Sequence, residues 1–227
     1  STACPSRRDR FIVDGQPFLM RAGELENSSA SSLPYLETLW PKFEAMHFNS
    51  LIAPVYWNLI EPQQGQFDFS TVDGLIEGAR AHDMRLVLLW FGSWKNSMSS
   101  YVPAWVKRGA SRYPRARRSD GTPMEILSAL DQVNLQADSA AFVALMKHLK
   151  QTDGERHTVV MVQVENEVGM IPEPRDHGPL ADAAFHAPVP TALTDYLSKH
   201  KEILAPGLKA AWRAKGFKTG ADWEDTF

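Results

Sequence analysis

This chain of 227 residues has little cysteine, no long apolar run and no large excess of charge of either sign. Its single cysteine, Cys4, cannot form an internal disulfide, and no catalytic or metal-ligand spacing surrounds it. No apolar run reaches about 18 residues, so no membrane-spanning helix is predicted. The net charge of −3 argues against a nucleic-acid partner, and the basic run at residues 112–118 is expected to be a solvated loop.

Phosphate-binding and metal-binding sequence patterns are also absent. No Gly-x-Gly-x-x-Gly or Gly-x-x-x-x-Gly-Lys sequence follows any expected strand, which argues against a nucleotide-dependent enzyme. The seven histidines are scattered along the chain without the spacing of a metal site. We therefore predict that the protein uses no cofactor and no catalytic metal.

Apolar strand-like runs alternate with helical patterns along the chain. The expected strands cover residues 21–24, 49–55, 85–91 and 157–164, and the expected helices cover 33–47, 70–83 (capped by Ser70), 103–108, 138–151 and 194–215 with a break at 206–207. Alternation of this kind predicts an α/β fold with a parallel sheet covered by helices. Residues 169–190 are expected to be irregular.

The spacing of these units favours a (β/α)8 TIM-barrel type of which about the first four βα units are present. A complete barrel typically needs about 250 residues, and four units with long loops occupy all 227 here. We therefore interpret residues 1–227 as the N-terminal portion of a single catalytic barrel domain. Residues 1–17 form an N-terminal extension and a hairpin that turns at Asp14-Gly15.

Polar and aromatic residues follow each expected strand. The candidate substrate-binding residues are Glu24 after the first strand, Tyr56, Trp57 and Asn58 after the second, Trp94, Lys95 and Asn96 after the third, and Asn166 after the fourth. The carboxyl ends of barrel strands meet at one edge and carry the chemistry in α/β barrels. Aromatic rings together with amides and carboxylates suit the apolar faces and hydroxyl rims of sugars. Four other tryptophans, Trp40, Trp105, Trp212 and Trp223, are expected to pack in the interior.

The fourth strand carries the strongest signal, because its apolar run ends in Glu165-Asn166-Glu167. If the strand continued through Glu167, both carboxylates would point to the same side, whereas a turn into a loop would separate them. The two carboxylates of a glycosidase flank the scissile bond from different faces, so one acid and one supporting carboxylate is the better interpretation.

Three motifs together resemble glycoside hydrolase family 35, the β-galactosidases. Gln163-Val164-Glu165-Asn166-Glu167-Val168-Gly169 is similar to the family's Gln-x-Glu-Asn-Glu-Tyr-Gly signature. The run at 55–62 with 65–69 resembles the second-strand motif, and Pro103-Ala104-Trp105 resembles the Pro-Ala-Trp after the third strand. The resemblance covers roughly residues 11–169, with the motifs in the family's order.

The resemblance implies roles for the residues of the motif at the fourth strand. Glu167 is expected to be the general acid/base and Asn166 to hold the 2-hydroxyl of the sugar, with Glu165 and Gln163 as supporting residues. The family's nucleophile ends the seventh strand, which lies outside this sequence. Val168 replaces the usual Tyr, Pro54 replaces a Tyr, Lys95-Asn96 stands where many members have Ala-Glu, and the first strand does not end in His-Tyr. These departures indicate a divergent bacterial-type branch.

We therefore predict a retaining glycoside hydrolase that removes terminal β-linked galactose from oligosaccharides or from plant polysaccharide side chains. The isolated chain, without a nucleophile, is expected to be inactive. A periplasmic or secreted location fits such a substrate. Two alternatives remain open, namely a non-hydrolytic carbohydrate-binding or assembly half-barrel that self-associates through its open edges, and a retaining barrel glycosidase for another sugar.

Overall fold

The computed structural model describes residues 10–227, and Cys4 lies outside the described residues. The chain divides into two compact units. The first runs to Arg115 and resumes over Glu125–Ile171, and the second comprises Ala116–Met124 and Pro172–Phe227. The predicted catalytic residues all belong to the first unit.

A four-stranded parallel sheet forms the centre of the first unit. Its strands are β3 (Ala22–Glu24), β4 (Ser50–Tyr56), β5 (Arg85–Phe91) and β8 (Val159–Gln163), in the order β3-β4-β5-β8. Each neighbouring pair is parallel, as expected when every strand is followed by a crossover through a helix. The predicted α/β class and its four parallel strands are confirmed.

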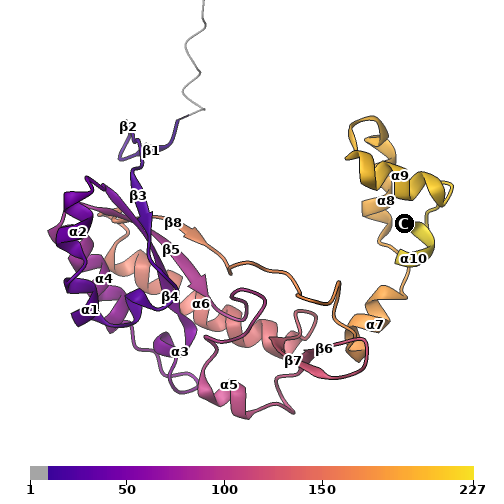
Figure 1. Ribbon diagram of the computed structural model, residues 1–227, viewed down its shortest axis with the longest axis horizontal. Coiled ribbons are helices and arrows are strands. Elements are labelled where there is room, and N and C mark those ends of the chain that lie inside the picture. The colour runs from indigo at the N-terminus through magenta and orange to yellow at the C-terminus, as the bar shows by residue number, and fades with distance from the viewer. Residues whose placement is uncertain (1–9) are drawn as a thin grey trace, which may run out of the picture. The chain divides into compact units, whose positions relative to one another are not determined.

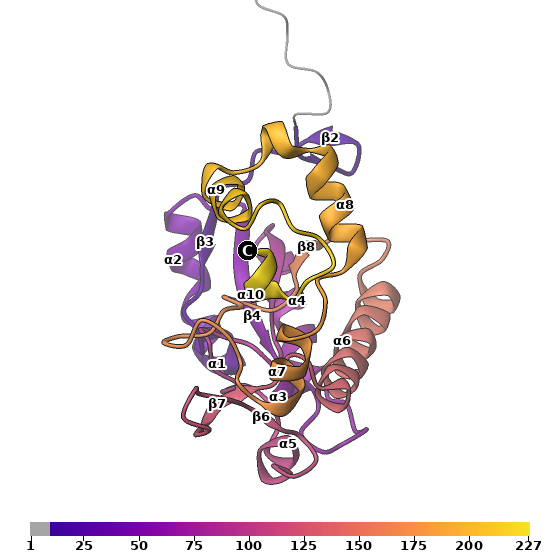
Figure 2. The same ribbon diagram turned by 90° about the vertical axis from the view of Figure 1, so that its right-hand side faces the viewer.

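Helices cover this sheet and bury a single core with it. They are α1 (Leu33–Glu37), α2 (Trp40–Ala45), α3 (Trp57–Ile60), α4 (Ser70–Ala81), α5 (Ala104–Arg108) and α6 (Gln132–Thr152). In α4 the buried residues Val72, Leu75, Ile76 and Ala79 recur at helical spacing, which gives one apolar face toward the sheet. Figures 1 and 2 show α1 and α2 at one end of this helical layer and α6 at the other.

Three predicted helix boundaries are wrong, each for a local reason. The helix expected over 33–47 is two helices, because Pro41 in the first turn of α2 cannot continue a preceding helix. Ser70 is the first residue of α4 rather than its cap, and its backbone N–H donates to Asp68 at 2.9 Å. Helix α6 begins six residues early, because the Asp131 carboxylate accepts from the N–H groups of Val133 and Asn134.

The predicted N-terminal hairpin is present as β1 (Ile12–Val13) and β2 (Gln16–Pro17). Asp14 and Gly15 at its turn both have positive φ, as a two-residue hairpin requires. The Asp14 carboxylate accepts from His157 Nδ1 at 2.6 Å and from Arg85 Nη2 at 2.8 Å. Arg85 begins β5 and His157 precedes β8, so the hairpin is attached at the amino ends of the strands.

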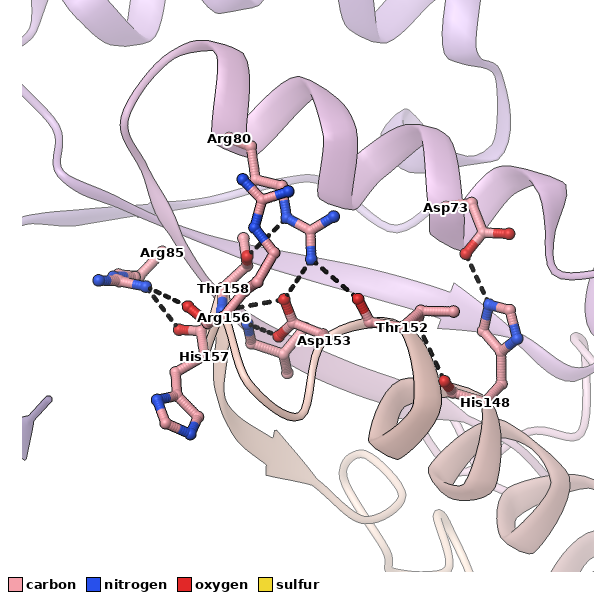
Figure 3. Close-up of polar contacts among 10 residues, drawn as sticks. Asp73, Arg80, Arg85, His148, Thr152, Asp153, Arg156, His157 and Thr158 are labelled. Carbon is pink, nitrogen blue, oxygen red and sulfur yellow. Dashed lines mark hydrogen bonds and ion pairs between the residues drawn. The ribbon is translucent and has the colours of Figure 1, made fainter.

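A buried carboxylate joins the end of α6 to the beginning of β8 (Figure 3). Asp153 accepts from the backbone N–H groups of Thr158 at 3.1 Å and Val159 at 2.7 Å, and from Arg80 Nη2 at 2.6 Å. Burial alone would raise the pKa of Asp153, but these hydrogen bonds outweigh burial and hold its pKa below the ordinary value.

The ribbon of β6 (Arg115–Arg117) and β7 (Pro123–Leu127) lies where the sequence led us to expect a loop, so that prediction is wrong. The second unit then contains α7 (Pro179–Phe185), α8 (Thr191–Lys199), α9 (Pro206–Ala214) and α10 (Trp223–Thr226). Helix α7 corrects the expectation that residues 169–190 are irregular, whereas the break at Pro206 is confirmed.

The tryptophans expected in the interior are mostly enclosed. Trp40 and Trp212 are fully buried, and the Trp212 indole N–H donates to the carbonyl of Lys218 at 2.8 Å. Trp105 is partly buried against the core, and Trp223 is half-buried beside Phe227. Among residues 10–227, no helix is long and apolar enough to cross a membrane.

Candidate active site

The predicted site residues lie at the carboxyl edge of the sheet, where loops from neighbouring strands are joined by backbone hydrogen bonds. The Asn58 N–H donates to the carbonyl of Tyr101 at 2.9 Å, which connects the ends of β4 and β5. The Asn166 N–H donates to the carbonyl of Trp94 at 3.3 Å, which connects the ends of β5 and β8. Glu24 ends β3 at the same edge and is exposed. The structure thus brings together residues that lie far apart in the sequence.

The carboxylates of Glu165 and Glu167 are separated by a turn of the backbone. Strand β8 ends at Gln163, and its side-chain amide donates to the carbonyl of Glu165 at 2.9 Å. Glu165 and Glu167 then adopt left-handed conformations, with φ of 60° and 50°. Few residues other than glycine adopt this conformation without strain. The sequence left open whether the strand continues through Glu167 or turns into a loop. The structure has the turn into a loop.

Glu165 is directed back into the scaffold. Its Oε2 accepts from the backbone N–H of Trp94 at 2.7 Å, and its Oε1 accepts from that of Ser93 at 3.2 Å. A second carboxyl group, that of Asp138 on α6, forms a side-chain hydrogen bond with Glu165. Asp138 in turn accepts from Ser93 N–H at 2.7 Å and from the indole N–H of Trp90 at 2.8 Å. Glu165 therefore joins β8, the loop after β5, and α6.

Two carboxyl groups this close cannot both be ionised without a large cost. Burial, followed by the hydrogen bond and charge of Asp138, raises the pKa of Glu165 to about 9. At neutral pH the two carboxyl groups therefore share one proton in the hydrogen bond between them. A Cβ atom on Gly92 would lie 2.6 Å from Glu165 Oε1 and 2.7 Å from Asp138 Oδ1, so only glycine leaves room for the pair.

Glu167 differs from Glu165, because its side chain is exposed at the carboxyl edge. Burial would raise the pKa of an acid/base residue, but residues 10–227 do not bury Glu167. Between the two glutamates, the carboxamide Oδ1 of Asn166 accepts from Lys95 Nζ at 2.8 Å. Lys95 Nζ also donates to Asn96 Oδ1 and lies 4.9 Å from the centre of the Phe91 ring.

The aromatic residues divide into enclosed and accessible rings. Trp57 is fully buried, with its indole N–H donating to Glu61 Oε2 at 2.8 Å, and Tyr56 is 2% exposed. Burial raises the pKa of the Tyr56 hydroxyl. Both side chains pack in the core, and their predicted part in binding a sugar stays a prediction. Trp94 is half-buried at the edge and keeps an accessible surface.

Asn58 also remains a candidate ligand residue. Its side-chain Oδ1 is buried and has no hydrogen-bond partner among the described residues. An acceptor in this situation favours a ligand hydroxyl or a water molecule as its partner. Within residues 10–227, no group of three or more His, Cys, Asp or Glu side chains has the arrangement of a metal site.

Sequence reasoning missed Asp138. The residue lies in α6 on the same face as the buried residues Asn134, Ala141 and Leu145. A carboxylate at a buried position of an apolar helical face is a signal of a specific partner, because burying an unpaired charge is costly. The early start of α6 hid this signal, since the expected helix began at Asp138 itself.

The model of the glycoside hydrolase 42 family, described as beta-galactosidase, matches residues 37–219. The chain belongs to this family. The predicted β-galactosidase homology is therefore confirmed, but the family whose model matches is family 42, and the finer assignment to family 35 stays a prediction.

Curated relatives give the same result. A beta-galactosidase of Xanthomonas manihotis is 29% identical over 185 residues, which covers 76% of this chain and 27% of that protein. A beta-galactosidase of Mus musculus is 30% identical over 171 residues, with coverage of 71% and 24%. The chain thus spans about a quarter of the length of these relatives.

A solved structure supports the fold. The chain is similar to a catalytic mutant of Gan42B, a GH42 beta-galactosidase from G. stearothermophilus, with a TM-score of 0.56 and 18% sequence identity. The match covers 92% of this chain and 27% of that structure. This coverage is consistent with part of a barrel.

Proposed function

We propose that these residues supply the acid/base half of the active site of a retaining glycosidase that removes terminal β-linked galactose. In this proposal Glu167 protonates the leaving oxygen and later activates water. Asn166 holds the 2-hydroxyl of the sugar, and Asn58, Trp94, Asn96 and Glu24 contribute to the sugar site. The nucleophile is a carboxylate outside these residues, so the isolated chain is inactive.

One observation carries the choice of Glu167 over Glu165. Glu165 is occupied by the N–H groups of Ser93 and Trp94 and by Asp138, whereas Glu167 is exposed at the carboxyl edge beside Asn166. A general acid must reach the leaving oxygen of a bound sugar. Glu165 is not free to do so without giving up its hydrogen bonds.

Finer features of the proposal come from the motifs. We propose that the chain represents a divergent branch with family 35-like motifs, in which residues 1–227 form the N-terminal portion of one (β/α)8 catalytic domain. Its substrates would be β-galactoside oligosaccharides or galactose side chains of plant polysaccharides. The replacement of Ala-Glu by Lys95-Asn96 supports a branch with its own sugar contacts.

Hydrolysis of aryl β-galactosides by a longer protein that includes these residues tests the assignment. Glu167→Gln should lower kcat/KM by at least about a hundredfold for substrates with poor leaving groups, because general acid catalysis contributes about 10² to 10⁴. For substrates with good leaving groups, which depart without a proton, the decrease in kcat/KM should be smaller. In Glu167→Ala, added azide should restore turnover and yield a β-galactosyl azide, since a small anion can replace the water that Glu167 activates.

Glu155→Gln, at an exposed position, is a matched control that should leave both substrate classes unchanged. Unaltered hydrolysis of poor-leaving-group substrates by Glu167→Gln would remove Glu167 from its role. Sugar binding without hydrolysis by the longer protein would instead favour the carbohydrate-binding alternative. A panel of aryl glycosides identifies the sugar if β-galactosides are not turned over.

A further inference from the structure

Lys95 is held rigidly beside Asn166. It begins a tight turn in which Lys95 N–H donates to the carbonyl of Met98 at 2.7 Å and Met98 N–H donates back at 3.0 Å. Asn96 and Ser97 at the tip have φ of 51° and 57°, as in the turns that match strand twist. The backbone of Lys95 also pairs with that of Asn166 in a parallel bridge. The backbone of Lys95, from which the ammonium group extends, is therefore held on both sides.

The ammonium group determines which way the Asn166 carboxamide faces. An ammonium group has three donors and no acceptor, so only the Oδ1 atom of Asn166 can face it. With Oδ1 2.8 Å from Lys95 Nζ, the NH2 group of Asn166 must point away from Lys95. No hydrogen bond from this NH2 group to another described residue is present. A pair of amide donors is thus left for a ligand.

Burying Lys95 without a counter-charge carries a cost. Lys95 is 8% exposed, and no described carboxylate lies within 4.0 Å of its Nζ atom. Its neighbours are two amide oxygens and the face of the Phe91 ring. A lysine is seldom buried without a counter-charge. A neutral apolar side chain of similar length would fill the same space without this cost, so packing alone does not account for a lysine here.

We propose that Lys95 is a positioning residue for sugar recognition, which fixes the Asn166 carboxamide so that its NH2 group donates to a sugar hydroxyl. The inference rests on the proposed function, in which Asn166 contacts the 2-hydroxyl. A hydroxyl that accepts from Asn166 keeps its own proton to donate to another group. The lysine also polarises the amide, which makes the NH2 group a stronger donor.

The test uses the longer enzyme that includes these residues and two substrates, an aryl β-galactoside and its 2-deoxy analogue. Lys95→Met should lower kcat/KM for the parent substrate by about tenfold to a hundredfold, the range for loss of a charge-assisted hydrogen bond. On the 2-deoxy substrate, kcat/KM of the same variant should fall by less than about threefold, because no 2-hydroxyl is present. Lys95→Arg retains a donor and should recover part of the activity.

A double-mutant cycle completes the experiment. In an Asn166→Ala background, Lys95→Met should cause little further loss on the parent substrate, because the two residues act as one unit. Equal losses on both substrates, or fully additive losses in the cycle, would overturn the inference and leave Lys95 as a structural residue. If Asn166→Ala alone lowered kcat/KM by the same factor on both substrates, the proposed role of Asn166 would instead be refuted. Thermal unfolding of each variant separates these outcomes from loss of folding.

Discussion

At the scale of single residues, the Glu165–Asp138 pair makes the fold sensitive to pH. The pKa of Glu165 is raised from 4.5 to about 9 by burial and by Asp138. Between these two values the folded chain holds a proton that the unfolded chain has released. The free energy of unfolding should therefore fall as pH rises from about 4.5 to 9 and level off above that range.

Glu165→Gln should remove this pH dependence. A Gln amide can donate to Asp138 through its NH2 group and accept from Trp94 N–H through its oxygen, so the contacts of the protonated acid are reproduced. Urea unfolding between pH 5 and 9 measures the effect, and the wild-type slope should exceed that of the variant by up to about 1.4 kcal/mol per pH unit. Glu155→Gln is the exposed control. Parallel curves for wild type and Glu165→Gln would show that no proton is shared.

Single residues also show how much of the site can be predicted from the sequence. The carboxyl ends of β4, β5 and β8 were predictable because apolar runs end in polar residues, and Glu165 was predicted as supporting. Its partner Asp138 was not predicted, because Asp138 and Glu165 lie 27 residues apart in the sequence and are brought together only by tertiary packing. The same holds for the burial of Tyr56 and Trp57, which the sequence pattern alone does not distinguish from an exposed platform.

At the scale of elements, strands were more predictable than helix ends. Strand β5 has the predicted bounds, Arg85 to Phe91, because its apolar run is uninterrupted. Two helix starts differ from the predicted ones for local reasons. Pro41 lacks the N–H group that a continuous helix would need, and the Asp131 carboxylate caps the start of α6. Ribbon β6–β7 was missed because its strands are short. Strand β6 has three residues, two of them arginine, and the alternation in β7 spans only Met124-Glu125-Ile126.

The attachment of α6 to β8 gives a prediction at this scale. Asp153→Ala removes one of the acceptors of Arg80 and leaves the backbone N–H groups of Thr158 and Val159 without their hydrogen-bond partner. We expect a loss of about 2–3 kcal/mol in the free energy of unfolding. Denaturant unfolding measures it, and the wild type should lose the same stabilisation only in strong acid, as pH falls through the lowered pKa of Asp153.

A second pair in Figure 3 supplies the control for this variant. Asp73 accepts from His148 Nε2 at 2.6 Å, but its side chain is 42% exposed. Asp73→Ala should therefore cost less than about 1 kcal/mol. A similar cost for the Asp153 and Asp73 variants would contradict the importance assigned to burial.

At the scale of the whole molecule, β8 is an open edge of the sheet with apolar side chains around it. Met161 is 48% exposed and Val164 is 63% exposed. An unpaired strand edge with exposed apolar residues pairs readily with another chain. We expect the isolated 227-residue chain to self-associate, with an apparent mass that rises with concentration in sedimentation experiments.

Val164→Lys tests whether this edge is responsible. A lysine directly after an edge strand opposes edge-to-edge pairing, so the variant should remain monomeric at concentrations where the wild type associates. Leu180→Lys, at an exposed apolar position of the second unit, is the control and should not change the association. Association that persists in Val164→Lys and disappears in Leu180→Lys would assign it to a different surface.

The hairpin of β1 and β2 has a practical consequence for work on this protein. Asp14 in its turn is hydrogen-bonded to His157 and Arg85 at the amino ends of the strands, whereas the candidate active site lies at their carboxyl ends. An affinity tag or surface linker fused ahead of the hairpin would therefore be anchored on the side away from Glu167. Immobilisation through that end should leave the carboxyl edge facing free solution, which suits polymer substrates too large to approach a blocked face.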